Sequence, residues 1–239
     1  MRPPEIIFED GYLLVLDKPP GWIVNDAETV KNQPTVQSWL RKNFHREAGY
    51  SFSQLLRSGI VHRLDKETSG VLLVAKTLDS FENLQRQFKE RRVKKTYIAL
   101  VHGQVEEKEG IIEASVGRLP WRRDRFGVLP GGREAKTGYK TMKQYDNKGL
   151  GKFSLLGLYP ETGRTHQIRI HLKYIDHPIV SDEFYAGRKT ARNDRKWCPR
   201  LFLHAGEIEF IHPKSGKKVH FKSELLEDLK SALNSLSRF

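Results

Sequence analysis

Short runs of apolar or alternating residues, separated by Gly, Pro or Asp-Gly, predict strands along most of the chain. "EIIF" and "YLLVLDKP" flank Asp10-Gly11, and Asp-Gly is a strong signal for a tight hairpin turn. Later runs are rich in β-branched and aromatic residues, which favour strands. The further predicted strands are "KTYIALVHG", "IIEASVG", "GYKTMKQY", "KFSLLGLYP" and a pair within "LFLHAGEIEFIHPKSGKKVHFK".

Apolar residues with a helical period predict helices between these strands. Residues 35–44 begin with a Thr that can cap a helix. The apolar residues on one face of this helix are Val36, Trp39, Leu40 and Phe44. The other predicted helices are "LDSFENLQRQFKERR", residues 165–175 and the terminal "SELLEDLKSALNSL". The pattern as a whole predicts an α+β fold, with a mixed, mostly antiparallel central sheet flanked by helices and loops.

Length and composition limit what this fold can be. The 239 residues contain 38% hydrophobic and 30% charged residues and one cysteine, a composition typical of a globular protein. One cysteine excludes an intramolecular disulfide and a multi-cysteine zinc site. The beginning of the chain lacks the apolar core of a signal peptide, and no run is long enough to span a bilayer. We therefore expect a cytoplasmic protein without a membrane partner.

The charge balance indicates a polyanionic partner. The net charge is +13, from 42 Lys and Arg against 29 Asp and Glu, and such a field attracts nucleic acid. A surface that only confers solubility is the alternative. Segments 117–138 and 185–200 mix Arg and Lys with Trp or Phe, which suits phosphate contact and base stacking. We expect both to be RNA-facing loops, although an ordinary solvated loop is the alternative for each.

The stretch "GIVHRLDKETSGVLLVAK", Gly59 to Lys76, places a dense polar group between apolar ends. If it begins as a strand, Arg63 and Asp65 lie on the same face, and the guanidinium can keep the carboxylate ionised. An ionised carboxylate can act as a nucleophile, base or metal ligand. A salt bridge that only fixes a loop is an equally weighted alternative on spacing alone.

The string itself is more specific than its spacing. "HRLDKETSG" resembles the "HRLDxxTSG" motif of the RluA family of pseudouridine synthases, with every fixed position present. "EDGYLLVLDKPPGWIV", "KKTYIALVHG", "ETGRTHQIRIHL" and "LFLHAGEIEFIHP" follow the order of that family and extend the resemblance from about residue 5 to residue 222. The resemblance implies the pseudouridine synthase catalytic fold, with an active-site cleft across its sheet.

It also implies isomerisation of uridine to pseudouridine in RNA, with Asp65 as the catalytic carboxylate. The sequence leaves three roles for this carboxylate open: attack on the uracil ring, attack on the sugar, and removal of a sugar proton. The resemblance further implies that Arg63 contacts the RNA backbone and helps to fill the space of a flipped base. Tyr97 corresponds to a tyrosine that stacks on the uracil, although a strand tyrosine on its own is more often part of a core.

Three further residues carry expected substrate contacts. Arg169 corresponds to the basic residue of the family that pairs with the aspartate, and Arg164 is its local competitor. In a helix over residues 165–175, Ile168, Leu172 and Ile175 share the packed face while Arg169 can point into a cleft. Ile168 is expected to line the base pocket and Leu203 to add an apolar contact, with ordinary core packing as the alternative for both.

The resemblance implies no metal and no organic cofactor, and ribosomal or transfer RNA as the partner. We expect residues 1–239 to form a single catalytic domain, or two lobes sharing one sheet, without a separate N-terminal RNA-binding domain. We further expect a monomer with no obligate protein partner.

Two other classes of function remain open from the sequence. A non-catalytic RNA-binding or RNA-chaperone module could keep the same scaffold. A metal-dependent nuclease would use the histidines, but His62, His102, His166, His171 and His204 form no recognised zinc-hydrolase spacing. We expect hydrogen-bonding structural roles for them.

Overall fold

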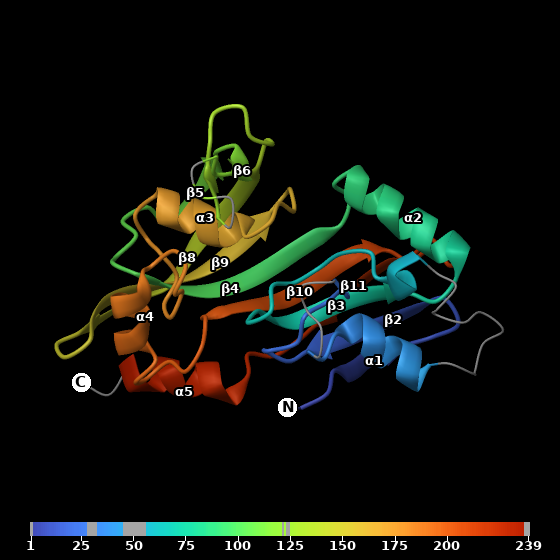
Figure 1. Ribbon diagram of the computed structural model, residues 1–239, viewed down its shortest axis with the longest axis horizontal. Helices are drawn as coiled ribbons and strands as arrows, with labels where there is room; N and C mark the ends of the chain where they lie inside the picture. Colours follow the sequence, from blue (N-terminus) through green and yellow to red (C-terminus); the bar gives the residue numbers. More distant parts are fainter. Residues whose placement is uncertain (1, 28–32, 45–55, 121, 123–124, 237–239) are drawn as a thin grey trace. The chain divides into compact units, whose positions relative to one another are not determined.

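The computed structural model describes residues 2–27, 33–44, 56–120, 122 and 125–236. By its internal contacts the chain divides into two compact units. Unit 1 comprises Met1–Lys94 and Ala205–Glu224, and unit 2 comprises Lys95–His204 and Leu225–Phe239. Each unit contains its own strands and helices (Figure 1). The predicted class, α+β with mostly antiparallel strands, is confirmed.

The strands of unit 1 are neighbours in the order β1, β2, β3, β10, β11. The pairs β1–β2, β2–β3 and β10–β11 are antiparallel. Strand β10 begins with the last two residues of unit 2, Leu203 and His204, and continues in unit 1. The bounds are Glu5–Glu9 for β1, Leu13–Lys18 for β2, Ser69–Ala75 for β3, Leu203–Ile211 for β10 and Lys218–Lys222 for β11.

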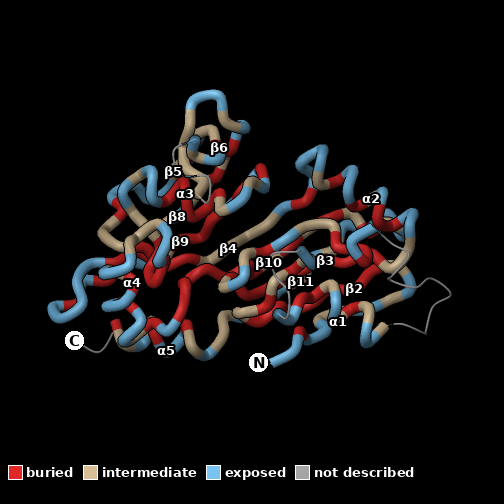
Figure 2. The backbone as a smooth tube through the Cα atoms, viewed as in Figure 1, coloured by how far each residue is buried: buried red, intermediate tan, exposed pale blue. Residues whose placement is uncertain are grey.

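The predicted hairpin at Asp10-Gly11 joins β1 and β2. The Asp10 carboxylate accepts hydrogen bonds from the backbone N–H groups of Tyr12 and Leu13, at 2.7 and 2.9 Å, as a turn-forming Asp commonly does. Strands β2 and β3 are buried along almost their whole length (Figure 2). Their register pairs Lys18, the last residue of β2, with Gly70 near the start of β3.

Two helices belong to unit 1, α1 (Val36–Asn43) and α2 (Leu78–Lys89). Thr35 caps α1 in a reciprocal capping box with Ser38, and Thr77 caps α2, which satisfies backbone donors that a helix start leaves unpaired. Phe81 and Leu84 of α2 lie in the apolar core with residues of β2, β3 and β10. Both predicted helices are confirmed.

The strands of unit 2 are neighbours in the order β4, β9, β8, β5, and all three pairings are antiparallel. Strands β6 and β7 form a separate hairpin. Strand β4 is Lys94–His102, β5 Glu109–Glu113, β6 Val116–Arg118, β7 Phe126–Val128, β8 Lys136–Asn147 and β9 Gly151–Pro160. Helix α3 is Gln167–Tyr174, α4 Arg188–Asp194 and α5 Glu227–Leu236.

The predicted face of the helix at residues 165–175 is confirmed. Ile168 and Leu172 of α3 belong to the main core of unit 2, and Ile175 packs against it. Helix α5 covers the same core with Leu229, Ala232 and Leu236.

Some local predictions were wrong. "IIEASVG" is not one strand, because the chain leaves β8 after Glu113 and pairs with β7 from Val116. Segment 185–200 is not only a loop, since it contains α4, a short and mostly charged helix with little apolar periodicity. Segment 117–138 contains the β6–β7 hairpin and the start of β8, and its residues 121, 123 and 124 lie outside the described residues. Within the described ranges, none of the helices combines the length and the apolar character needed to cross a membrane.

We predict that Cys198, the only cysteine, is inert in the folded protein. Its side chain is buried, and burial raises the pKa of the thiol to about 12, so the reactive thiolate is scarce at neutral pH. A chromogenic disulfide reagent should detect almost no thiol in the native protein and one thiol per chain in concentrated guanidinium chloride. Rapid full reaction of the native protein would contradict this placement.

Candidate active site

Asp65 lies in an irregular loop of unit 1, which we call the motif loop and define as residues 61–68. Strand pairing stops before it: Ile60 makes an isolated bridge with Val74, and then the His62 ring accepts a 2.9 Å hydrogen bond from the Leu73 N–H. The His62 side chain thus accepts a hydrogen bond from the Leu73 N–H, which would pair with backbone if the strand continued. The chain is therefore not a strand through Arg63 and Asp65, and the condition under which these two side chains would share a face is not met.

A buried ammonium ties the motif loop to the end of β2. Lys18 is 0% exposed, and its Nζ donates to the carbonyl oxygens of Pro19, Trp22 and Lys66 at 3.0, 3.0 and 3.2 Å. The backbone N–H of Gly21 donates to the same Lys66 oxygen at 2.7 Å. A buried charge is tolerated when it is fully hydrogen-bonded. The carbonyl oxygen of Lys66, the residue directly after Asp65, is therefore held by two hydrogen bonds.

The C-terminal end of the motif loop is held by close backbone packing. The Thr68 N–H donates to the Asp65 carbonyl at 3.2 Å, closing a tight turn. Gly70 follows with φ of +112°, and a Cβ at this position would lie 2.1 Å from the Ala205 carbonyl oxygen. Only glycine fits this approach, which explains the glycine that ends the "HRLDKETSG" string.

Arg63 is exposed and Asp65 is partly buried. No ion pair joins them in the described part of the chain, so the salt bridge considered as an alternative role for these two residues is not formed there. The Arg63 guanidinium is left exposed beside the loop, where a ligand can reach it.

Three of the predicted site residues lie in one apolar cluster of unit 2. Ile168 and Leu203 are 7% and 3% exposed members of its core, and Tyr97 of β4 is partly buried against it. Tyr97 pairs in register with Leu158 of β9, another core residue. These three therefore belong to the same core of unit 2, while Arg63 and Asp65 belong to unit 1.

Arg169 is held in one orientation by a buried carboxylate. Its Nε and Nη2 donate to the two oxygens of Asp182 at 2.7 and 2.9 Å. The guanidinium also lies over the rings of Phe184 and Tyr185, at 5.6 and 5.1 Å from their centroids. A bidentate pair combined with ring stacking fixes the plane of a guanidinium. Pairing of Arg169 with Asp65 stays a prediction.

Hydrogen bonds also fix the start of α3. Gln167 accepts from the Thr162 hydroxyl at 2.7 Å and donates to the Lys136 carbonyl and the Thr137 hydroxyl, both at 3.0 Å. His171 donates from Nε2 to the Ala114 carbonyl at 3.0 Å, so its Nδ1 accepts from Thr137 at 2.9 Å. Burial lowers the pKa of His171, in keeping with this neutral tautomer. The network fixes the helix that carries Ile168 and Arg169.

The other predicted alternatives occupy structural positions. Arg164 Nε donates to the Glu134 carbonyl at 3.1 Å. His102 contacts Asp194 at 2.9 Å, and His166 contacts the Tyr185 hydroxyl at 3.0 Å. Within the described ranges, no group of three or more His, Cys, Asp or Glu side chains is placed to hold a metal ion.

Sequence reasoning missed Lys18 and Asp182. Lys18 follows the apolar run "LLVL" and Asp17 and precedes "PPG", and a lysine at the end of a buried strand is a weak signal for a buried charge. Asp182 stands in "HPIVSDEFY", where nothing in the spacing marks it as the partner of Arg169, thirteen residues earlier.

We predict that removing the Asp182 carboxylate strongly destabilises the fold, because it removes the bidentate ion pair of the buried Arg169 guanidinium. Asp182→Ala should lower the free energy of unfolding in urea by about 3–5 kcal/mol. Glu183→Ala is the matched control. Glu183 is exposed and its ion pairs with Arg188 and Arg195 are long, at 3.6 and 3.8 Å, so the loss should be below about 1 kcal/mol. Equal losses from both variants would contradict the assignment.

Comparisons with known proteins identify the family of this chain. A family model described as RNA pseudouridylate synthase matches residues 12–174. This range includes the motif loop, β4 with Tyr97, and α3 with Ile168 and Arg169.

Curated relatives extend the match to nearly the whole chain. A "ribosomal large subunit pseudouridine synthase D" of Nitrosomonas europaea is 38% identical over 238 residues, which is 98% of this chain and 65% of the relative. An uncharacterized RNA pseudouridine synthase, YlyB, of Bacillus subtilis is 35% identical over 234 residues, 98% of this chain and 73% of the relative. The chain thus spans slightly less than two thirds of the length of the first of these.

A solved structure extends the match to the fold. The human protein titled "RNA Pseudouridylate Synthase Domain Containing 1" superposes with a TM-score of 0.70 at 26% identity, covering 100% of this chain and 98% of that one. Taken with the matched motif loop and the curated relatives, this likeness shows that the chain belongs to the RluA-type family of RNA pseudouridylate synthases.

Proposed function

We propose that this protein isomerises uridine to pseudouridine in RNA, with Asp65 as the catalytic carboxylate. The observation that carries the proposal is the motif loop together with Ser69 and Gly70 at the start of β3. Every fixed position of the family motif is present there, and the loop is held at His62 and at Lys66. A carboxylate on a fixed loop is suited to acting on a nucleotide that has been flipped out of its stack.

The reaction breaks the bond between the ribose and nitrogen one of uracil, turns the base, and joins the ribose to carbon five. The base must be detached without being lost, so the site has to hold it throughout. Carbon five loses its hydrogen when the new bond forms, and that hydrogen passes to solvent. Asp65 takes part as nucleophile or as base.

The other proposed contacts divide between the two units. Arg63 is exposed and has no ion pair to Asp65. It contacts the RNA backbone and helps to fill the space left by the flipped base. Tyr97 stacks on the uracil, and Ile168 and Leu203, from the same apolar cluster, line its pocket. Arg169, oriented by Asp182, is the proposed basic partner of Asp65.

We propose ribosomal RNA as the first substrate to test, because the relative from Nitrosomonas europaea is named for the large ribosomal subunit. Transfer RNA is the second. The proposal includes a cytoplasmic location, action as a monomer, and catalysis by a single domain without metal or organic cofactor.

We predict that Asp65→Asn lowers the rate by at least about a thousandfold while RNA affinity stays within about twofold, because the change keeps shape and removes charge. The measurement is tritium release from unmodified ribosomal and transfer RNA transcripts labelled at carbon five of uridine. Asp146→Asn is the matched control, since Asp146 is exposed and has only a long ion pair to Lys152, at 3.6 Å; its rate should equal that of the wild type.

Full activity of Asp65→Asn would refute the assigned catalytic residue. RNA binding by the wild-type protein without release from either transcript pool would refute the proposed isomerisation of these RNAs. It would instead support a non-catalytic RNA-binding module.

A further inference from the structure

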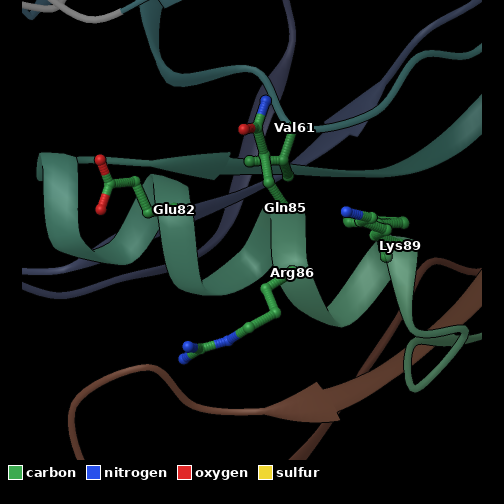
Figure 3. Close-up of a pocket in the computed structure, with 6 residues that line it drawn as sticks. Val61, Glu82, Gln85, Arg86 and Lys89 are labelled. Carbon is green, nitrogen blue, oxygen red and sulfur yellow. The ribbon is translucent and has the colours of Figure 1, made fainter.

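A groove in unit 1 lies between α2 and the motif loop. Its volume is about 570 Å³, and it is lined by Val61, Phe88 and one polar face of α2. Figure 3 shows the polar side chains projecting from that helix, with Val61 contributed by the motif loop. These polar residues are Glu82, Gln85, Arg86 and Lys89. We call this surface the α2 groove.

The α2 groove is fixed to the motif loop by an aromatic contact. The His62 ring stacks on Phe88, with centroids 5.1 Å apart and planes 29° apart. The same His62 accepts the hydrogen bond from Leu73 of β3. Helix, loop and strand are therefore tied together at one point, and the groove keeps its place beside the loop that carries Asp65.

The two cations of the groove are available for a ligand. Arg86 and Lys89 are exposed, and neither makes an ion pair in the described part of the chain. Glu82 lies one turn before Arg86 but is not ion-paired with it there. Beyond the helix, Arg91 is another exposed cation. Glu90, between Lys89 and Arg91, is ion-paired with Arg92, so net positive charge remains at the C-terminal end of α2, and Glu82 marks the other end of the groove.

We propose that the α2 groove binds the RNA backbone close to the target nucleotide, with Arg86 and Lys89 each contacting a phosphate. This inference rests on the proposed function and adds a second RNA contact to it. Val61 precedes Asp65 by four residues, and four extended residues span at most about 14 Å. This bound places the Val61 edge of the groove near Asp65, so we expect phosphates in the groove to belong to nucleotides near the target. Because phosphate contacts position a nucleic acid without reading its sequence, the groove sets the register of the RNA.

The test compares the double variant Arg86→Gln/Lys89→Gln with Lys42→Gln/Lys217→Gln, which removes two exposed lysines of unit 1 outside the groove. RNA binding is measured by fluorescence anisotropy across a salt series, with an unmodified ribosomal RNA transcript as the probe. The groove variant should bind about fivefold more weakly. Its slope of log affinity against log salt should fall by about 0.7 for each lost phosphate contact. The control should keep the wild-type affinity and slope.

The variant Glu82→Gln tests the opposite change in the charge of the groove. Removing a negative charge from the groove should tighten RNA binding, whereas a groove that takes no part in binding would leave it unchanged. Far-UV circular dichroism of each variant checks that α2 remains folded. Acetylation of Lys89 in the wild-type protein should also be slowed by RNA, while that of Lys217 should not, which tests the proposal without any substitution.

The outcomes separate this proposal from the proposed function. Wild-type affinity and salt slope in the groove variant, with tritium release intact, would overturn the α2 groove and leave the isomerase proposal standing. Absence of tritium release from the wild-type protein, with weakened binding by the groove variant, would overturn the isomerase proposal and leave the groove as an RNA-binding surface. Protection of Lys89 and Lys217 to the same extent would also count against the groove.

Discussion

The buried ammonium of Lys18 is the interaction on which the position of Asp65 most depends. It lies at the end of β2 and gathers three carbonyl groups, two from the turn that follows β2 and one from the motif loop. Neutral side chains have at most two donors on one nitrogen, whereas an ammonium has three. The cost of burying the charge is offset by these bonds, and two distant parts of unit 1 are joined.

In unit 2 another buried cation sets the orientation of a proposed site residue. Arg169 is held by Asp182 and two aromatic rings, and α3 is held by the Gln167 and His171 network. Lys18 thus holds backbone carbonyl groups of the motif loop and of the turn after β2, whereas Asp182 holds the side chain of Arg169. In both units, the fold uses buried polar groups with defined partners to support the residues proposed to contact RNA, an arrangement that specifies geometry as well as stability.

Periodicity and turn chemistry predicted the regular elements well. The Asp10-Gly11 hairpin, the Thr-capped α1 and the packed face of α3 all follow from local patterns, because each depends on residues close in the chain. The conformation of the motif loop could not be predicted from local patterns, because it depends on partners far away in sequence. His62 takes a donor of β3, and Lys18 reaches Lys66 across forty-eight positions.

The candidate site shows the same limit. Sequence motifs identified four of the site residues, Arg63, Asp65, Tyr97 and Arg169. A motif identifies a residue but does not give its contacts in the folded protein. The ion pair expected between Arg63 and Asp65 is absent from the described part of the chain, because the loop does not have the alternation of a strand. Asp182 and Lys18 emerged only from the packed structure, since their roles are defined by the groups they hold.

The central claim is that the anchored motif loop positions Asp65 for catalysis. Its most direct test is the single-turnover rate of tritium release by Lys18→Met at saturating RNA, with Lys76→Met as the control, because Lys76 pairs with Glu9 away from the loop. Methionine keeps an unbranched side chain as far as the ε position and removes the ammonium donors. We expect folded Lys18→Met to release tritium at least about tenfold more slowly at wild-type RNA affinity, and Lys76→Met to keep the wild-type rate. A wild-type rate from folded Lys18→Met would contradict the central claim.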